Sequence, residues 1–203
     1  MKKILFIVLM ALPSALFAQE NDLCFWNAMS IKKSVSDKWT VGVRGEHRAY
    51  KDAGATQQYY FRPMVEYDVL SWLKLTAQSD FAWTSSGFNI RLLPQAQGTY
   101  KTHGFTLSLR QRLQATWKEP DNSWSCLFRT KAQVRYKIPK TPLSPFVAAE
   151  PYYWARFNRT RYYAGVSVAC SKNLSVQLEY VYQDYYQRAY DDNVIWLTFN
   201  VKL

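Results

Sequence analysis

The sequence contains few of the residues from which enzymes and metal-binding proteins build their sites. It has only two histidines, and its three cysteines are an odd number, whereas an exported disulfide framework usually has an even set. No histidine, cysteine and carboxylate residues occur together at the spacing of metal ligands, and no glycine-rich nucleotide-binding motif is present. The sequence therefore predicts no metal, no cofactor and no catalytic residue.

Long apolar runs are also rare. The run at residues 4–12 follows Lys2 and Lys3 and is followed by small residues up to Ala18, which is the layout of a secretory signal peptide. It is far shorter than the roughly 20 residues that a membrane-spanning helix needs, and no later stretch reaches that length. We predict a signal peptide at residues 1–18 and a single domain at residues 19–203, in which any membrane crossing is made by strands.

The sequence is instead rich in alternation of apolar and polar residues, which is a strand pattern. In one segment Leu107 and Leu109 share a face, while Arg110 and Arg112 share the other. The segments are about 10 to 13 residues long, whereas strands of soluble proteins average about 5 or 6. Strands that cross a bilayer at a tilt need roughly 9 to 11 residues, so these segments are long enough to span one.

The number of strands is less certain from the pattern, because about eleven segments alternate and a closed antiparallel barrel needs an even number. Counting back from the C-terminus gives about ten strands from Trp39 onward and leaves residues 23–33 with the wrong direction. We therefore predict an all-β fold, a single-chain antiparallel transmembrane β-barrel of about 10 strands, with 12 as the alternative. Residues 23–33 would be a plug or a short partner inside the barrel, unless a strand has been wrongly divided.

Alternation does not by itself say which face is the interior. A soluble periplasmic barrel of the lipocalin type, with its apolar residues inside, is the main alternative. Aromatic residues make up 17% of the chain and cluster near segment ends, as in the aromatic girdles of outer-membrane barrels. Residues 195–203 are apolar at every second position, which resembles the C-terminal assembly signal of such barrels. These features favour an apolar face towards lipid.

This interpretation implies a location and partners. We expect export followed by insertion into the cell outer membrane, where the barrel contacts outer-membrane lipid and lipopolysaccharide. The barrel-assembly machinery would act during insertion. The formal net charge of +11 is compatible with nucleic acid, but basic residues on the lumen side of exported strands argue against that partner.

The polar faces of the strands would then fill the lumen with charge. We predict a charge network made of Arg44, Glu46, Arg48, Arg62, Glu66, Arg110, Arg112, Arg129, Arg135 and Glu150. A narrow barrel leaves little room for water, so these groups must pair, because an unpaired buried charge is costly. Two interpretations remain open: a salt-bridged plug that stiffens the barrel, or a net basic lining that binds or passes anions.

Several of these features together resemble a known family. They are Trp26 in a first strand, Lys38-Trp39 after a turn, the pairs Glu46-x-Arg48 and Arg110-x-Arg112, the strand with Arg129 and Arg135, and Glu150. The sequence resembles the bacterial outer-membrane barrels grouped as domain of unknown function family 2490, over roughly residues 21–203. The resemblance implies the barrel fold and the outer-membrane location, and it brings no assigned activity.

An enzyme is the alternative from a different functional class. An outer-membrane lipid-modifying or proteolytic enzyme would have its site at the rim of the barrel and would need a nucleophile, a base and an orienting group within reach of each other. His47 falls on the apolar side of its strand and His103 in a short turn, and neither accompanies Ser79-Asp80 or Asp191-Asp192. We expect a barrel of unassigned activity that is structural or related to small solutes or anions.

Overall fold

The computed structural model describes residues 22–50, 56–187 and 191–203, and the predicted signal peptide lies outside them. Every regular element in the described chain is a strand. The twelve strands are β1 (Asp22–Ser34), β2 (Trp39–Tyr50), β3 (Thr56–Leu70), β4 (Leu73–Thr84), β5 (Gly87–Leu92), β6 (Gln95–Thr102), β7 (Phe105–Lys118), β8 (Ser123–Tyr136), β9 (Leu143–Trp154), β10 (Arg156–Ala169), β11 (Leu174–Tyr185) and β12 (Asp192–Lys202). In the part of the chain described here, no helix is long and apolar enough to cross a membrane.

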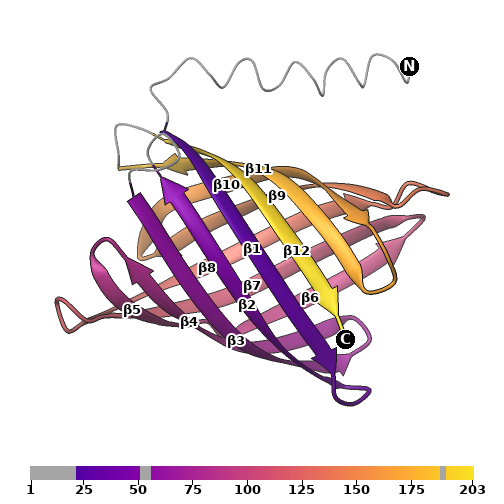
Figure 1. Ribbon diagram of the computed structural model, residues 1–203, viewed down its shortest axis with the longest axis horizontal. Helices are drawn as coiled ribbons and strands as arrows, with labels where there is room; N and C mark the ends of the chain where they lie inside the picture. The colour runs from indigo at the N-terminus through magenta and orange to yellow at the C-terminus, as the bar shows by residue number, and fades with distance from the viewer. Residues whose placement is uncertain (1–21, 51–55, 188–190) are drawn as a thin grey trace.

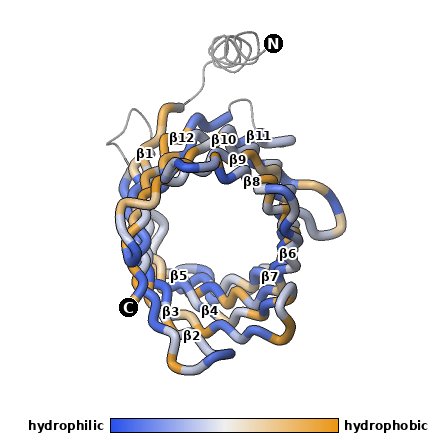
Figure 2. Tube along the Cα trace, turned by 90° about the vertical axis from the view of Figure 1, so that its right-hand side faces the viewer, coloured by the Kyte–Doolittle hydropathy of each residue, from blue (hydrophilic) through white to orange (hydrophobic). Residues whose placement is uncertain are grey.

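The strands form one sheet that closes into a barrel (Figure 1). Strands that follow one another in the chain are hydrogen-bonded neighbours, except that β5 and β6 both lie between β4 and β7. Strand β1 pairs with β12 and so completes the ring. Viewed towards the end of the barrel, the backbone encircles a central space (Figure 2). The predicted all-β barrel is confirmed.

Strands β5 and β6 occupy one position in the wall. Both pair with β4 on one side and with β7 on the other, β5 along one half of the position and β6 along the other half. Leu93 and Pro94 separate them, and Pro94 has no backbone N–H for a continuous ladder. Twelve strands therefore fill eleven positions, close to the expected number of about ten.

An odd number of positions forces one pair of neighbours to run parallel. That pair is β1 and β12, whose register runs from Asp22 opposite Asp192 to Lys32 opposite Lys202. The expectation that all neighbours are antiparallel is wrong at this seam, and residues 23–33 are a wall strand and not a plug. We call the end of the barrel where β1 begins the N-terminal end and the end where β12 finishes the C-terminal end.

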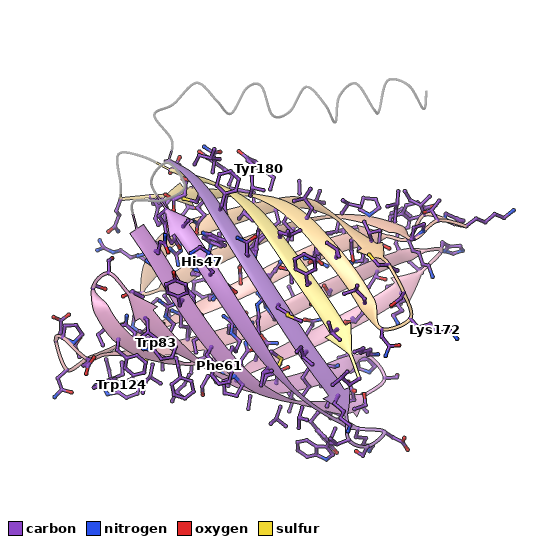
Figure 3. All side chains as sticks on the ribbon, in the orientation of Figure 1. His47, Phe61, Trp83, Trp124, Lys172 and Tyr180 are labelled. Carbon is purple, nitrogen blue, oxygen red and sulfur yellow. The ribbon has the colours of Figure 1, made fainter. Side chains whose placement is uncertain are left out.

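The outer face of the wall is apolar. Phe61, Trp83 and Leu109 have exposed fractions of 45%, 52% and 58%, and the first two are labelled on the outer wall in Figure 3. Trp72, Trp124 and other aromatic residues near strand ends are exposed as well. Charged residues such as Glu46, Glu150 and Arg112 are buried inside. This arrangement is the inverse of a soluble lipocalin-like barrel, which keeps its apolar residues inside.

One side of the interior is nevertheless apolar. A cluster of buried side chains lines the inner face near the seam, from strands β1, β9, β10, β11 and β12; its members are Cys24, Trp26, Phe146, Tyr163, Val181 and Val194. Pairing of β9, β10 and β11 fixes the registers that bring these side chains together. The interior therefore combines an apolar cluster at the seam with charged side chains, some of which contact that cluster.

The packing at Gly165 generates a testable prediction. A Cβ atom at Gly165 would lie 2.6 Å from the backbone oxygen of Leu178 and 2.8 Å from Cζ of Phe146, so the wall would have to shift. We expect Gly165→Ala to lower the free energy of unfolding by about 1–3 kcal/mol, measured by urea unfolding of the detergent-folded protein. Gly45→Ala is the matched control, because a Cβ there meets nothing within 4 Å. Equal stability of the two variants would contradict the described packing.

Candidate functional site in the barrel interior

The candidate site is the charged side of the barrel interior. The predicted network residues come from strands β2, β3, β7, β8 and β9, where every second side chain faces inward. Seven of them line one cavity: Arg44, Arg62, Glu66, Arg110, Arg112, Arg129 and Glu150. Arg135 is part-buried, and Glu46 and Arg48 are buried in the interior.

Strand β2 carries a compact triplet of charges. Arg44 Nε donates to Glu46 Oε2 at 3.1 Å, and Arg48 Nε donates to Glu46 Oε1 at 2.5 Å. Two-residue spacing places all three side chains on the same face of the strand, so the carboxylate lies between the two guanidinium groups. Only 5% of Glu46 and 8% of Arg48 is exposed, so this triplet is formed away from water.

Glu150 on β9 is the most heavily bonded carboxylate of the site. It is fully buried and accepts hydrogen bonds from Arg110 at 2.6 Å, from Arg129 at 3.1 and 3.2 Å, and from the Tyr163 hydroxyl at 2.5 Å. The Tyr152 hydroxyl lies at 3.4 Å from the same group. One carboxylate thus balances two guanidinium groups from two neighbouring strands. Hydrogen bonds between ions are stronger than neutral ones, which makes Glu150 the central anion of this region.

Two further carboxylates of the interior, Glu66 and Asp80, differ in the kind of cation that they bind. Glu66 accepts from Lys32 at 2.7 Å and from Lys74 at 3.2 Å, so its partners are ammonium groups and not guanidinium groups. Arg62 pairs with Asp80, with 2.9 Å between Arg62 Nη2 and Asp80 Oδ2. A lysine is a flexible point charge, whereas the arginine fork holds a carboxylate at two atoms, so the Arg62 pair is the more rigid one.

Two predicted network residues lack a carboxylate partner among the residues that the structure describes. Arg112 donates through Nε to the amide oxygen of Gln95 at 2.9 Å. Arg135 donates to the amide oxygen of Gln177 at 3.2 Å, and its guanidinium lies over the Phe146 ring at 4.8 Å from the centroid. The network is therefore a set of separate ion pairs and triplets, with uncharged glutamines at these two positions.

The N-terminal half of the interior is filled by a stack of arginine and aromatic side chains, which we call the arginine–aromatic stack. The Arg48 guanidinium lies 4.1 Å from the centroid of Trp26 and 4.5 Å from that of Tyr60. The Arg161 guanidinium lies 5.0 Å from the centroids of both Trp26 and Tyr152. Cations over aromatic faces are attracted by the ring quadrupole, and the attraction is stronger where water is absent. Trp26 and Tyr152 are 0% and 1% exposed.

Arg161 was missed by the sequence analysis, although a signal for it exists. Arg159-x-Arg161 repeats the spacing of Arg110-x-Arg112, but the register between β9 and β10 shifts at residues 157–159. That irregularity interrupts simple alternation in this segment. Arg161 Nε donates to the amide oxygen of Gln183 at 2.5 Å, and Gln183 in turn donates to Asp192 at 2.7 Å. These contacts extend the stack to the wall at β11 and β12.

The C-terminal half of the interior contains a cavity of about 380 Å³. Its lining is mostly polar, and none of the five side chains of the arginine–aromatic stack belongs to it. Lys32 and Lys74 line its outer part, where 34% and 37% of their side chains are exposed. The cavity therefore lies towards the C-terminal end, where these two lysines reach solvent.

The two histidines lie in different parts of the barrel. His47 stacks on Tyr59, with 5.0 Å between ring centroids, and is labelled on β2 in Figure 3. His103 lies in the turn between β6 and β7, where its Nδ1 is 2.8 Å from the Thr102 hydroxyl. Within residues 22–50, 56–187 and 191–203 no group of three or more histidine, cysteine or carboxylate residues could hold a metal ion.

Two solved structures share this arrangement of strands. A structure described as the NanC porin in a rhombohedral crystal form has a TM-score of 0.57 and 12% sequence identity, covering 90% of this chain and 99% of the porin. The KdgM porin has a TM-score of 0.55 and 13% identity, covering 80% of this chain and 91% of the porin. Identities this low establish the fold alone, and they define this chain as a porin-like β-barrel.

The family follows from the sequence itself. The model of the family described as protein of unknown function DUF2490 matches residues 24–194, so the chain belongs to that family. The resemblance noted from the charged pairs and Trp26 is thereby confirmed. No curated protein matches the sequence.

The bonding of the buried carboxylates generates a second prediction. Glu150→Gln removes the anion shared by Arg110 and Arg129 and leaves positive charge uncompensated in a poorly hydrated space. We expect a loss of about 3–5 kcal/mol in the free energy of unfolding, and a comparable loss for Glu46→Gln. Glu119→Gln is the control, because Glu119 is exposed and should tolerate the change. A Glu150→Gln protein as stable as the control would show that the buried charges do not hold the barrel together.

Proposed function

We propose that this protein is an outer-membrane barrel with a largely structural interior, closed to free passage of solutes at its N-terminal half. The observation that carries the proposal is the combination of an apolar outer wall with an interior filled by ion pairs and by the arginine–aromatic stack. The two porins of similar fold, the predicted signal peptide and the alternating apolar residues 195–203 support the location.

The outer wall supports lipid as its immediate partner. Exposed side chains on neighbouring strands include Val43, Phe61, Leu107, Leu109 and Val147, and together they make a surface that water would solvate poorly. Outer-membrane lipid and lipopolysaccharide would cover that surface, and the barrel-assembly machinery would insert the chain. A barrel satisfies all backbone hydrogen bonds within its own wall, which the hydrocarbon core requires.

Closure distinguishes this proposal from an open pore. A continuous pore needs a wetted path from one end to the other, and the lining of the lumen cavity includes none of the five side chains of the arginine–aromatic stack. The stack is made of buried side chains, among them Trp26, Tyr152 and Arg161 with 0%, 1% and 4% exposed.

A second candidate function is favoured by a separate observation. The cavity in the C-terminal half has more basic than acidic side chains in its lining, which suits a role in handling small anions. This role is compatible with a closed barrel, because the cavity reaches solvent at the C-terminal end.

The proposed location can be tested by cell fractionation. We expect the mature protein to be recovered with the outer membrane and to migrate faster in detergent gels when it is left unboiled, because a folded barrel remains compact in the detergent. The alternative is that the chain forms a soluble lipocalin-like barrel in the periplasm. Recovery in the soluble periplasmic fraction would contradict the proposal.

Closure can be tested by recording currents across planar bilayers. We expect the unmodified barrel to show no large, stable conductance, and Trp26→Ala to produce intermittent currents, because this substitution removes the ring that Arg48 and Arg161 share. Trp124→Ala is the control, since Trp124 is 61% exposed on the outside and should leave the barrel silent. Large, stable anion currents through the unmodified protein would rule out a closed interior.

A further inference from the structure

The lining of the lumen cavity is strongly unbalanced in charge. Eight basic and three acidic side chains contribute to it: Lys32, Arg44, Arg62, Lys74, Arg110, Arg112, Arg129 and Lys131 against Glu66, Glu150 and Glu179. Charges enclosed by a wall of low polarity interact more strongly than charges in water. An excess of this size in a confined space therefore needs either compensation nearby or a bound anion.

The carboxylates of the cavity are already occupied. Glu66 is bonded by Lys32 and Lys74, and Glu150 by Arg110 and Arg129. Glu179 accepts a hydrogen bond from the amide of Gln177 at 2.5 Å.

Two further cations of the cavity find their anions outside its lining. Arg44 pairs with Glu46 at 3.1 Å, and Arg62 pairs with Asp80. After these pairs are formed, Arg112 and Lys131 are the cavity cations with no ion pair in the described chain.

The contacts of Arg112 and Lys131 are with uncharged groups. Arg112 is 5% exposed and bonds to the neutral amide of Gln95, while the Lys131 ammonium lies over the Tyr163 ring at 3.8 Å from its centroid. The register between β7 and β8 sets Arg112 directly opposite Arg129 and Arg110 directly opposite Lys131. Like charges in opposite positions destabilise a sheet, and Glu150, which bonds Arg110 and Arg129, compensates only part of this four-cation block.

Unused hydrogen-bond donors lie around the same cavity. Arg110 Nε, Trp196 Nε1 and Thr198 Oγ1 are buried and have no hydrogen-bond partner, and all three residues line the cavity. A buried donor without an acceptor costs free energy, which a ligand with several oxygen atoms would recover. The charge and the donors thus call for the same kind of ligand.

We propose that the cavity is a binding site for a small organic or inorganic polyanion that carries two or more carboxylate or phosphate groups. The Arg112 guanidinium, whose Nε and Nη2 otherwise donate to the Gln95 amide oxygen, binds one anionic group in place of that amide, and the Lys131 ammonium, one strand away, binds another. A volume of about 380 Å³ is at the small end of ligand pockets, which limits the solute to a compact molecule. The inference rests on the proposed function in one respect, because closure at the stack leaves the C-terminal end as the route of access.

Calorimetric titration of the detergent-folded protein tests the site, with citrate and pyrophosphate as probes and glycerol as the neutral control. We expect saturable binding of at least one anion, weakened by added salt, and none of glycerol. Tighter binding of citrate would indicate a preference for carboxylate groups, and tighter binding of pyrophosphate a preference for phosphate groups. Arg112→Gln and Lys131→Gln should each weaken binding by about 10- to 100-fold, the loss of one charge-assisted hydrogen bond. Arg135→Gln is the matched control, since Arg135 is also basic and on β8 but is not part of the cavity lining.

A second variant supplies the missing anion from the chain itself. Gln95→Glu replaces the amide that Arg112 bonds by a carboxylate of the same shape. We expect it to raise the melting temperature in the absence of ligand and to weaken binding of the polyanion, because Arg112 is then already paired. Stronger or unchanged binding in this variant would contradict the assignment of Arg112.

The outcomes separate this proposal from the proposed function. Absence of binding by both anions, or equal binding by the unmodified protein and by Arg112→Gln with its folded gel mobility intact, overturns the site. Neither result bears on closure or location. A conducting or periplasmic protein overturns the proposed function and leaves the titration unchanged.

Discussion

The structure depends on the enclosure of charge in a space with little water. An apolar outer wall sends the polar face of each strand inward, and eleven positions make a lumen that side chains can largely fill. Buried ions are tolerable only where opposite charges and donors meet them. Glu46, Glu150 and Asp80 each hold one or two arginines on the same strand or on strands one or two positions away, so ion pairs link nearby strands of the wall.

Aromatic side chains stabilise positive charges inside the barrel in addition to the carboxylates. In the lining of the lumen cavity basic side chains outnumber acidic ones, eight to three, so carboxylates are scarce inside the barrel. Trp26, Tyr60 and Tyr152 offer ring faces to these guanidinium groups, which are weakly hydrated and planar and therefore stack well. Ring faces and ion pairs therefore act together: Arg48 at the N-terminal end also pairs with Glu46, and Lys131 at the cavity lies over the Tyr163 ring.

Much of this fold could be predicted from the sequence because a strand has a period of two. Parity alone separates Leu107 and Leu109 from Arg110 and Arg112, and the structure places the first pair outside and the second inside. The pairing of particular charges could not be predicted, because Glu66 meets Lys32 only through the registers of β1, β2 and β3. The direction of β1 followed from counting strands, but its place in the wall was missed, because a closed single-chain barrel was assumed to need an even number of antiparallel strands.

The parallel seam has a consequence for the sidedness of the molecule. In a barrel with an even number of antiparallel strands, the first and last strands run in opposite directions, and both termini emerge on one face of the membrane. Here β1 and β12 run side by side in the same direction, so Asp22 and Leu203 lie at opposite ends of the barrel (Figure 1). An epitope next to Asp22 and another next to Leu203 would therefore be accessible from opposite sides of the proposed outer membrane. Two antibodies, one against each epitope, would determine the orientation of the chain.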